Sequence, residues 1–277
     1  MQSLNIEKTY RVLLGDVNRF RIMLVGCGGT GSTLALFLAG LAFHAQQKGI
    51  QIDLTLVDHD HVDTTNPGRQ NFAPVEAVNG FPKVSSLATR LSSAYGLAIS
   101  AWPVRYEAGL ASDWFDYNAG GQTQAHLIIG CVDSHRGRQE IAKTVETFHG
   151  RIYALDSGNA EFNGQILMGN LIHLEQIKLD RLGLCTGLPS PYVQEPGLLE
   201  PEEAQQALSC AEMMLREEQS LMINRLAAAI AAQFVTDFVL NRQVMQMGAV
   251  FNLDPTVMRP ILITQANINQ CQKKRRP

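Results

Sequence analysis

The sequence has few cysteines, and their spacing matches no disulfide or metal framework. The five cysteines are odd in number and scattered, with no Cys-x-x-Cys pair. This argues against a disulfide scaffold and against a structural zinc knuckle. The seven histidines, among them His59 and His61, lack the His-Glu-x-x-His spacing of a zinc enzyme. Free cysteines suit a reducing compartment, so we expect a cytoplasmic protein.

The chain also has little net charge and no long apolar run. The formal charge is -3 and the isoelectric point is about 6.2, so no global positive field favours a nucleic-acid partner. We interpret the basic run within 271–277 as a solvated tail. No segment approaches the roughly 20 uninterrupted apolar residues of a membrane span. The first residues also lack the apolar core and cleavage site of a signal peptide.

What the sequence does contain is an alternation of apolar runs and helical segments. With 277 residues, 45% of them hydrophobic, the chain can bury one large core. The periodicity predicts strands over 21–25, 51–58, 98–104, 126–132 and 151–155, and helices over 32–43, 82–95 and 136–148. This order predicts an α/β fold, a Rossmann-like doubly wound and mainly parallel sheet.

The remaining segments predict an arm before this sheet and an extension after it. We expect an N-terminal arm or helix over 1–20, a nucleotide-binding domain over 21–160 and a C-terminal part of the same domain over 161–270. Within that last part we predict further sheet over 165–174, a Pro/Gly-rich crossover over 183–200, helix over 202–242 and terminal strands over 248–264.

A glycine-rich turn joins the first predicted strand to the first predicted helix. It contains Gly26, Gly28, Gly29 and Gly31. Glycine lets the backbone approach a phosphate, and a helix start offers free N–H groups and a positive dipole end. Asp58 ends the next strand, where a carboxylate can accept hydrogen bonds from ribose hydroxyls. These features predict a nucleotide site without separating ATP from NAD.

The loop after Asp58 favours ATP. We assign to the nucleotide site the polar and charged residues that follow it, namely Asp60, Asn66, Arg69, Gln70 and Lys83. A triphosphate needs converging cations because charge builds up on the leaving pyrophosphate, whereas a dinucleotide rarely does. Two alternatives stay open: an NAD-dependent oxidoreductase, favoured by the glycine turn alone, and a non-catalytic ATP-binding scaffold.

These motifs together resemble a known family. The ordered set Gly-x-Gly-Gly-x-Gly-Ser, Asp-x-Asp, Asn-x-x-Arg-Gln, Gly-x-x-Lys and Cys-x-Asp-Ser is similar to the ThiF/MoeB superfamily, which includes the ubiquitin-activating enzymes. The layout more narrowly resembles the ThiF-related members of a plasmid-borne cassette called PRTRC. The resemblance implies an ATP-dependent adenylyltransferase that activates the C-terminal carboxylate of a small ubiquitin-like or sulfur-carrier protein ending in Gly.

The resemblance also implies roles for individual residues. Amides near Gly29 would contact the nucleotide, Asp58 would hold the ribose, and Asn66, Arg69 and Lys83 would meet the phosphates. Catalysis would rest on positioning and charge neutralisation, since the attacking carboxylate is already ionised and needs no general base.

Further roles follow at the next strand end and in the arm. Asp133, with Ser134 beside it, would hold Mg²⁺ or orient the attacked phosphate, and Arg138 matches a family arginine. Family members are homodimers or pseudo-dimers in which an N-terminal arginine reaches the partner's ATP. We therefore expect a homodimer, with Arg11 or Arg19 as that arginine. The missing Cys-x-x-Cys pairs depart from the sulfur-carrier enzymes and put a zinc site in doubt.

Two cysteines compete as acceptors of the activated carboxyl group in a thioester. Cys210 resembles the family's cysteine at a helix start, where the helix dipole lowers the pKa of a thiol. Cys185, followed by Thr186 on the crossover, resembles the Cys-Thr pair of ubiquitin-type enzymes. The alternative for each is a small, inert packing residue, which is the common fate of a free cysteine.

Overall fold

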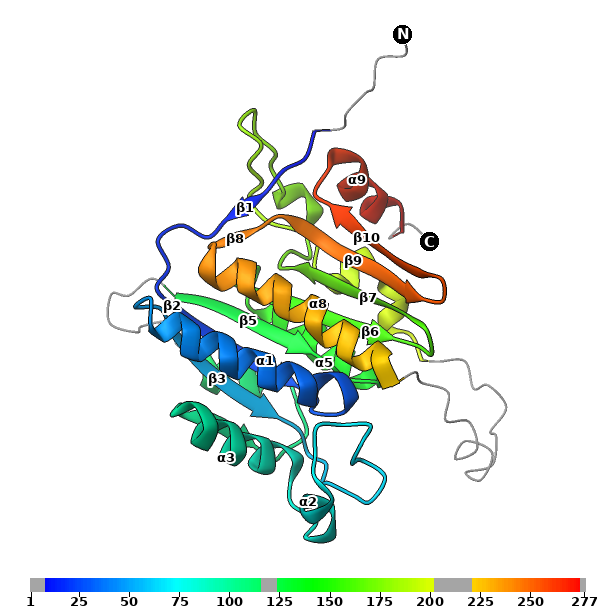
Figure 1. The fold of residues 1–277 in the computed structure, drawn as a ribbon. Helices are drawn as coiled ribbons and strands as arrows, with labels where there is room; N and C mark the ends of the chain where they lie inside the picture. The colour runs from blue at the N-terminus through cyan, green and yellow to red at the C-terminus, as the bar shows by residue number, and fades with distance from the viewer. Residues whose placement is uncertain (1–7, 116–123, 202–220, 275–277) are drawn as a thin grey trace.

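The computed structural model describes residues 8–115, 124–201 and 221–274. An eight-stranded sheet runs through them in the spatial order β10-β9-β7-β6-β5-β2-β3-β4 (Figure 1). Its strands are β2 (Arg19–Val25), β3 (Gln51–Val57), β4 (Ile99–Trp102), β5 (Gln124–Gly130), β6 (Ile152–Asn159), β7 (Asn163–Gly169), β9 (Gln246–Leu253) and β10 (Thr256–Leu262). The five strands from β4 to β6 are parallel, whereas β7, β9 and β10 are antiparallel to their neighbours.

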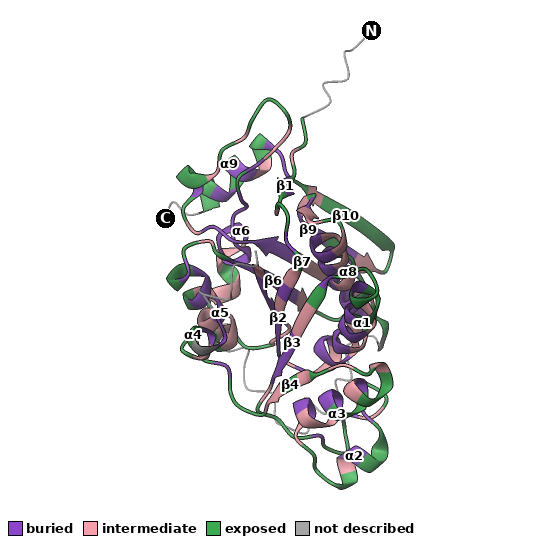
Figure 2. Cartoon of the chain, turned by 90° about the vertical axis from the view of Figure 1, so that its left-hand side faces the viewer, coloured by how far each residue is buried: buried purple, intermediate pink, exposed green. Residues whose placement is uncertain are grey.

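Helices cover both faces of this sheet (Figure 2). On one face lie α1 (Gly29–Gln46), α3 (Lys83–Tyr95) and α8 (Leu221–Leu240), and on the other α4 (Leu110–Trp114) and α5 (His135–Thr147). The central strands are apolar on both sides for this reason: in β2, Phe20, Ile22 and Leu24 face the first set of helices, while Met23 and Val25 face the second. The doubly wound, mainly parallel α/β class is confirmed.

Shorter elements complete the described chain. They are α2 (Pro74–Val78), α6 (Pro191–Gln194), α9 (Gln265–Lys274), two 3₁₀ turns at Leu174–Gln176 and Pro196–Leu199, and a two-stranded ribbon of β1 (Val12–Leu13) and β8 (Gln243–Val244). The segment over 1–20, which we expected to be an arm or helix, therefore contributes the two-residue strand β1 and the first two residues of β2.

Two other segments differ from the sequence-based expectation, and a third lies partly outside the described residues. The strand expected over 165–174 already ends at Gly169, where a Cβ would lie 1.8 Å from the Pro189 carbonyl oxygen, so the crossover segment packs too closely for the strand to continue. Helix α9 continues to Lys274, four residues into the segment that we assigned to the basic tail, and Lys274 Nζ lies 2.6 Å from Glu195 Oε2. In the helical prediction over 202–242, residues 202–220 lie outside the described residues, and α8 accounts for the rest.

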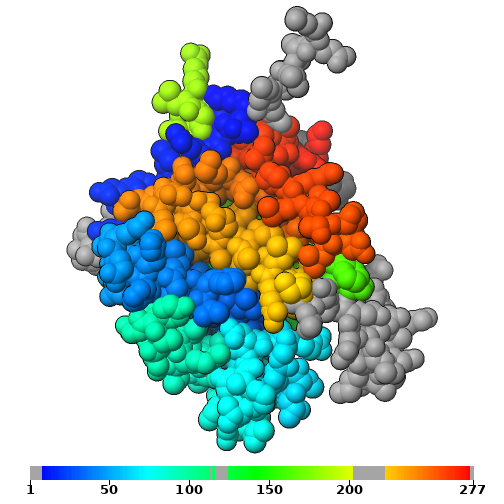
Figure 3. Space-filling model, viewed as in Figure 1, coloured from blue at the N-terminus to red at the C-terminus, as the bar shows by residue number. Residues whose placement is uncertain are grey.

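Helix α8 is long and largely apolar, although Arg225 and Asp237 interrupt its apolar residues. The stretch Met222–Leu240 is long and apolar enough to cross a membrane by length and composition alone. Half of that stretch is buried in the fold, where α8 packs along α1 and over β6 and β7. Figure 3 shows the two helices side by side across this face of the molecule. Its composition is therefore accounted for by its place as a core helix.

Candidate active site

A cavity of about 610 Å³ opens at the carboxyl ends of the parallel strands. Parallel strands bring their carboxyl ends to one edge of a sheet, where α/β proteins bind ligands. Nine of the predicted site residues line the cavity: Gly26, Gly28, Gly29, Asp58, Asp60, Gln70, Lys83, Asp133 and Ser134. Gly31, Asn66 and Arg69 are not among the lining residues, and neither is Cys185.

The glycine turn is shaped by two residues and opened to the cavity by a third. Gly26 has φ +87°, and a Cβ there would lie 2.5 Å from the Cys131 carbonyl oxygen. A Cβ on Gly31 would lie 1.9 Å from the Gly26 carbonyl oxygen, so this buried glycine serves the turn and not a ligand directly. At Gly28 a Cβ would meet nothing within 4 Å, because this residue faces the open cavity.

The turn leads directly into helix α1, whose start carries no side-chain cap. Gly28 is the N-cap residue, and no acidic side chain lies in the first turn. The first N–H groups of a helix have no partner within it and carry the positive end of its dipole. The start of α1 therefore suits a phosphate group.

Asp58 lies at the end of β3 with its carboxylate held in a fixed direction. Asp58 Oδ2 accepts a hydrogen bond from the Cys27 backbone N–H at 2.6 Å, and Oδ1 accepts one from the Asp60 N–H at 2.9 Å. Only 8% of the side chain is exposed. The carboxylate therefore links the glycine turn after β2 to the end of β3, at the edge of the cavity.

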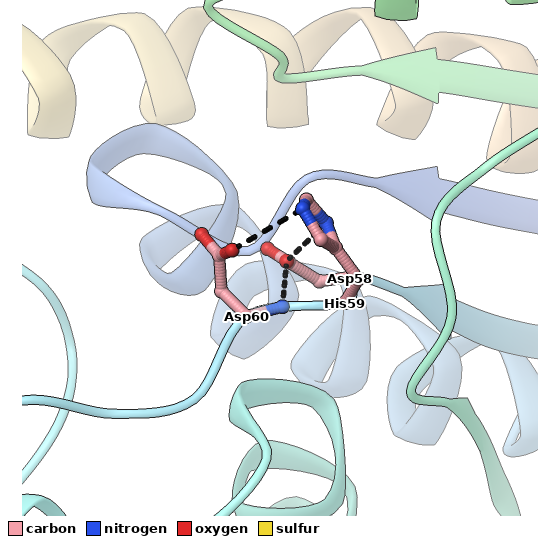
Figure 4. Close-up of side chains that lie close together, drawn as sticks. All are labelled: Asp58, His59 and Asp60. Atoms are coloured by element: carbon pink, nitrogen blue, oxygen red, sulfur yellow. Dashed lines mark hydrogen bonds and ion pairs between the residues drawn. The ribbon is translucent and has the colours of Figure 1, made fainter.

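The side chains of Asp58, His59 and Asp60 lie close together after β3 (Figure 4), and two basic side chains from elsewhere in the chain contact them. The buried Lys83 Nζ lies 3.1 Å from Asp60 Oδ2. His59 Nε2 lies 2.6 Å from an Arg105 guanidinium nitrogen, and since a guanidinium only donates, this imidazole nitrogen accepts. Asp58, His59 and Asp60 also bring their ligand atoms within 4.8 Å of one another. Within this group, Lys83 already neutralises the Asp60 carboxylate.

Of the three predicted site residues in the loop from 63 to 70, one lines the cavity and two do not. The buried Asn66 uses its side chain on the loop itself: Nδ2 donates to Asp63 Oδ1 at 2.9 Å, and Oδ1 accepts from the Asp63 N–H at 3.2 Å. Arg69 is exposed and lies outside the cavity lining. Gln70 does line the cavity, and its buried Oε1 has no hydrogen-bond partner within the described part of the chain.

At the end of β5, Asp133 and Ser134 lie side by side in the cavity lining. Ser134 caps α5, because its Oγ accepts from the Gly137 N–H at 3.3 Å. Asp133 is exposed to the cavity. Proteins hold Mg²⁺ through one or two carboxylates together with substrate phosphates and water, so Asp133 fits the metal that the family resemblance implies.

The end of β6 adds polar residues that the sequence argument missed. Ser157 and Asn159 line the cavity, together with Asn224 from α8. Asp156, on the opposite side of β6, is fully buried and accepts a hydrogen bond from Arg138 Nε at 3.3 Å. Burial raises the pKa of Asp156 to about 6, although the Arg138 guanidinium opposes the shift. For Ser157 and Asn159 the only signal in the sequence was their position at a strand end, and for Asn224 of α8 there was none.

The cysteines within the described residues are not poised as nucleophiles. Burial raises the pKa of the Cys27, Cys131 and Cys185 thiols. Cys185 donates its thiol proton to the Gly187 carbonyl oxygen at 2.8 Å, and it packs near Tyr153 at the amino end of β6, away from the cavity. Cys210 lies outside the described residues.

The two candidate arginines of the arm differ in what they contact. Arg19 pairs with Asp53 of its own chain at 2.7 Å, at the amino end of β2. Arg11 is exposed next to the crossover, where its carbonyl oxygen accepts from the Cys185 N–H at 2.9 Å.

The sequence of this chain matches the model of a known family, and its structure resembles those of known proteins. The crystal structure of PaaA matches with a TM-score of 0.56 and 13% identity, over 91% of this chain and 65% of PaaA. Escherichia coli MccB matches with a TM-score of 0.55 and 12% identity, over 91% of this chain and 63% of MccB. This chain therefore spans less than two thirds of either protein. No curated protein sequence is significantly similar to it. The model of the ThiF family matches residues 4–270, so the chain belongs to the ThiF family.

Proposed function

We propose that this protein is an ATP-dependent adenylyltransferase that activates the carboxylate of a peptide or small protein. The observation that carries the proposal is the convergence of the glycine turn, Asp58 and the buried Lys83 on one cavity. E. coli MccB, a structure of similar fold, has been crystallised with ATP and also with MccA, which supports a site for a nucleotide and a peptide.

The chemistry asks little of the protein beyond positioning and charge. A carboxylate oxygen of the substrate bonds to the α-phosphorus, and the bond from that phosphorus to the bridging oxygen breaks. Pyrophosphate leaves with the electron pair, and no proton has to move. Lys83 would turn from Asp60 to the leaving phosphates, and the α1 N–H groups would hold the α-phosphate. Bound at Asp133, Mg²⁺ would neutralise phosphate charge.

The substrate that we propose is a small ubiquitin-like or sulfur-carrier protein ending in Gly. A C-terminal glycine has no side chain, so only its backbone has to be accommodated beside the phosphates. We propose further that the enzyme works as a cytoplasmic homodimer. Arg11 remains the better candidate for a contact across it, because Arg19 already pairs with Asp53.

ATP–pyrophosphate exchange tests the proposal. The protein is incubated with ATP, Mg²⁺, labelled pyrophosphate and candidate small proteins ending in Gly, and label should enter ATP only when a substrate is present. The matched control is the same protein lacking its final glycine, which should give no exchange. Tight binding of NAD with no binding of ATP would instead favour an oxidoreductase. ATP binding without exchange for any candidate would favour a non-catalytic scaffold.

A further inference from the structure

The last residues of β6 extend past the end of β5. The pairing of β5 with β6 stops at Gly130 and Asp156, whereas the pairing of β6 with β7 continues to Asn159 and Gly164. Among the described strands, residues 157–159 therefore have a neighbour on one side only. Their other side opens on the cavity, which Ser157 and Asn159 line.

Ser157 brings an unused hydroxyl to this opening. Residues two apart in a strand share a face, so Ser157 and Asn159 point to the same side as Tyr153 and Leu155. Tyr153 and Leu155 belong to the core beneath α1 and α8, but by Ser157 the apolar cover has ended. Ser157 is only 4% exposed, and its Oγ has no hydrogen-bond partner within the described residues. A buried hydroxyl without a partner is costly, and a ligand group can remove that cost.

Asn159 is held in place by two other elements. Its Nδ2 donates to Asn224 Oδ1 of α8 at 3.0 Å. Thr30, in the first turn of α1, donates to the same Asn224 oxygen at 2.9 Å. Asn159 also lines a second cavity of about 490 Å³, which it shares with Arg138. It therefore stands where the nucleotide cavity meets the neighbouring one, with its amide fixed by α1 and α8.

The strand order gives this opening a direction relative to the nucleotide. Asp58 and the Lys83–Asp60 pair lie at the β3 side of the glycine turn, whereas Ser157 and Asn159 lie beyond β5 on the other side. In phosphoryl transfer the entering and leaving oxygens are roughly in line. If pyrophosphate leaves toward Lys83, the entering carboxylate must come from the β6 side.

We infer that Ser157 and Asn159 form the subsite for the acyl group, an inference that rests on the proposed function. Ser157 Oγ donates a hydrogen bond to the carboxylate oxygen that becomes the carbonyl oxygen of the acyl-adenylate. Asn159 fixes the position of the acyl chain at the junction of the two cavities. The second carboxylate oxygen is left free to bond to phosphorus while pyrophosphate departs. The subsite thus distinguishes an acylated nucleotide from the nucleotide alone.

Two ligands that differ only in the acyl group test this inference. Adenosine 5′-sulfamate mimics AMP, and the same compound acylated with N-acetylglycine mimics a glycyl adenylate without reacting. Calorimetry gives the dissociation constant of each for the wild-type protein and for Ser157→Ala and Asn159→Ala. The control is Ser190→Ala, since Ser190 Oγ is also buried without a partner in the described structure but lies outside the cavity.

We expect Ser157→Ala to weaken the acylated ligand about tenfold, the effect of one hydrogen bond to a charged group, and to leave the unacylated one within about twofold. Asn159→Ala should also lower the preference of the protein for the acylated ligand over the unacylated one. Ser190→Ala should change neither dissociation constant. Equal losses for both ligands, or no loss for the acylated one, would overturn the acyl subsite while leaving adenylation intact. If the wild-type protein binds neither these ligands nor ATP, the proposed function itself fails.

Discussion

In β2 and β6, the two ends of the strand carry different kinds of residue on the face toward α1 and α8. At the amino end, the rings of Phe20 in β2 and Tyr153 in β6 both pack against Phe238 of α8, with centroid distances of 5.7 and 5.1 Å. At the carboxyl end, the same two strands lead into a glycine turn and into Ser157 and Asn159. Large rings fill the first end, whereas glycine and polar side chains leave a cavity at the second end.

Along the same strands, the residues at the amino end therefore stabilise the fold, whereas we expect those at the carboxyl end to serve binding and catalysis. Burying an aromatic side chain contributes a few kcal/mol of transfer free energy. The carboxyl end forgoes such burial and keeps polar groups, such as Ser157 Oγ and Gln70 Oε1, without partners in the described structure. We therefore expect substitutions at the carboxyl end to alter binding and catalysis, unless the backbone turn itself is affected.

The largest effect should come from Gly31→Ala. The added Cβ would lie 1.9 Å from the Gly26 carbonyl oxygen, a backbone atom that cannot move without opening the turn. We expect a loss of unfolding free energy of about 4 kcal/mol or more, in the range of severe core lesions, measured by urea denaturation. Gly28→Ala is the matched control, because its Cβ meets open space: the unfolding free energy should hold while ATP binding weakens. Equal stability losses in both variants would contradict this account of the turn.

Next in size is Lys83→Ala. This removes the buried cation at the cavity, so the transition state loses one stabilising contact. In other enzymes the loss of one such contact slows catalysis by about 10²–10³-fold. The rate of ATP–pyrophosphate exchange measures the loss. Lys143→Ala is the control, since Lys143 is an exposed lysine with its own carboxylate partner, Glu140, at 2.6 Å. An exchange rate near that of the wild type in Lys83→Ala would remove Lys83 from the mechanism.

The parallel half of the sheet could be predicted well from the sequence, because its strands carry a strong local signal. Strands buried on both faces read as continuous apolar runs, and the glycine turn marks where β2 ends and α1 begins. β7 ends earlier than expected because Gly169 contacts the crossover near Pro189, a segment twenty residues away along the chain. A local pattern carries no information about such a contact.

Motif residues that lie within a few positions of a strand end, as Asp58 and Asp133 do, line the cavity as the sequence leads one to expect. Residues do not line it where the loop itself decides the direction of the side chain. Asn66 turns inward to Asp63, and Arg69 stays in solvent, although both match the family pattern. Asn224 reaches the cavity from a helix almost two hundred residues beyond the glycine turn, so only the folded structure reveals it.

A smaller effect, a change of up to about 3 kcal/mol in the unfolding free energy, should come from the ionisation of Asp156. Burial raises its pKa from 3.8 to about 6, and each pKa unit corresponds to about 1.4 kcal/mol. Between these values the folded protein keeps a proton that the unfolded chain has lost, so this contribution to stability is present near pH 4 and is lost as the pH rises through 6. We expect the unfolding free energy of the wild type, relative to Asp156→Asn, to fall over this range and to level off above it. A difference independent of pH would contradict the shift.

The smallest effect tests the amino end of the sheet through Cys185. Its buried thiol has a raised pKa and donates to the Gly187 carbonyl oxygen, so little thiolate is available. Each pKa unit above the solution pH lowers the thiolate fraction about tenfold. We expect iodoacetamide to alkylate Cys185 at least about tenfold more slowly in the folded protein than in urea, as followed by mass spectrometry of the labelled peptide. Equal rates in the two states would mean that this thiol is exposed and ionisable when the chain is folded, and the contrast between a packed amino end and a reactive carboxyl end would then no longer hold.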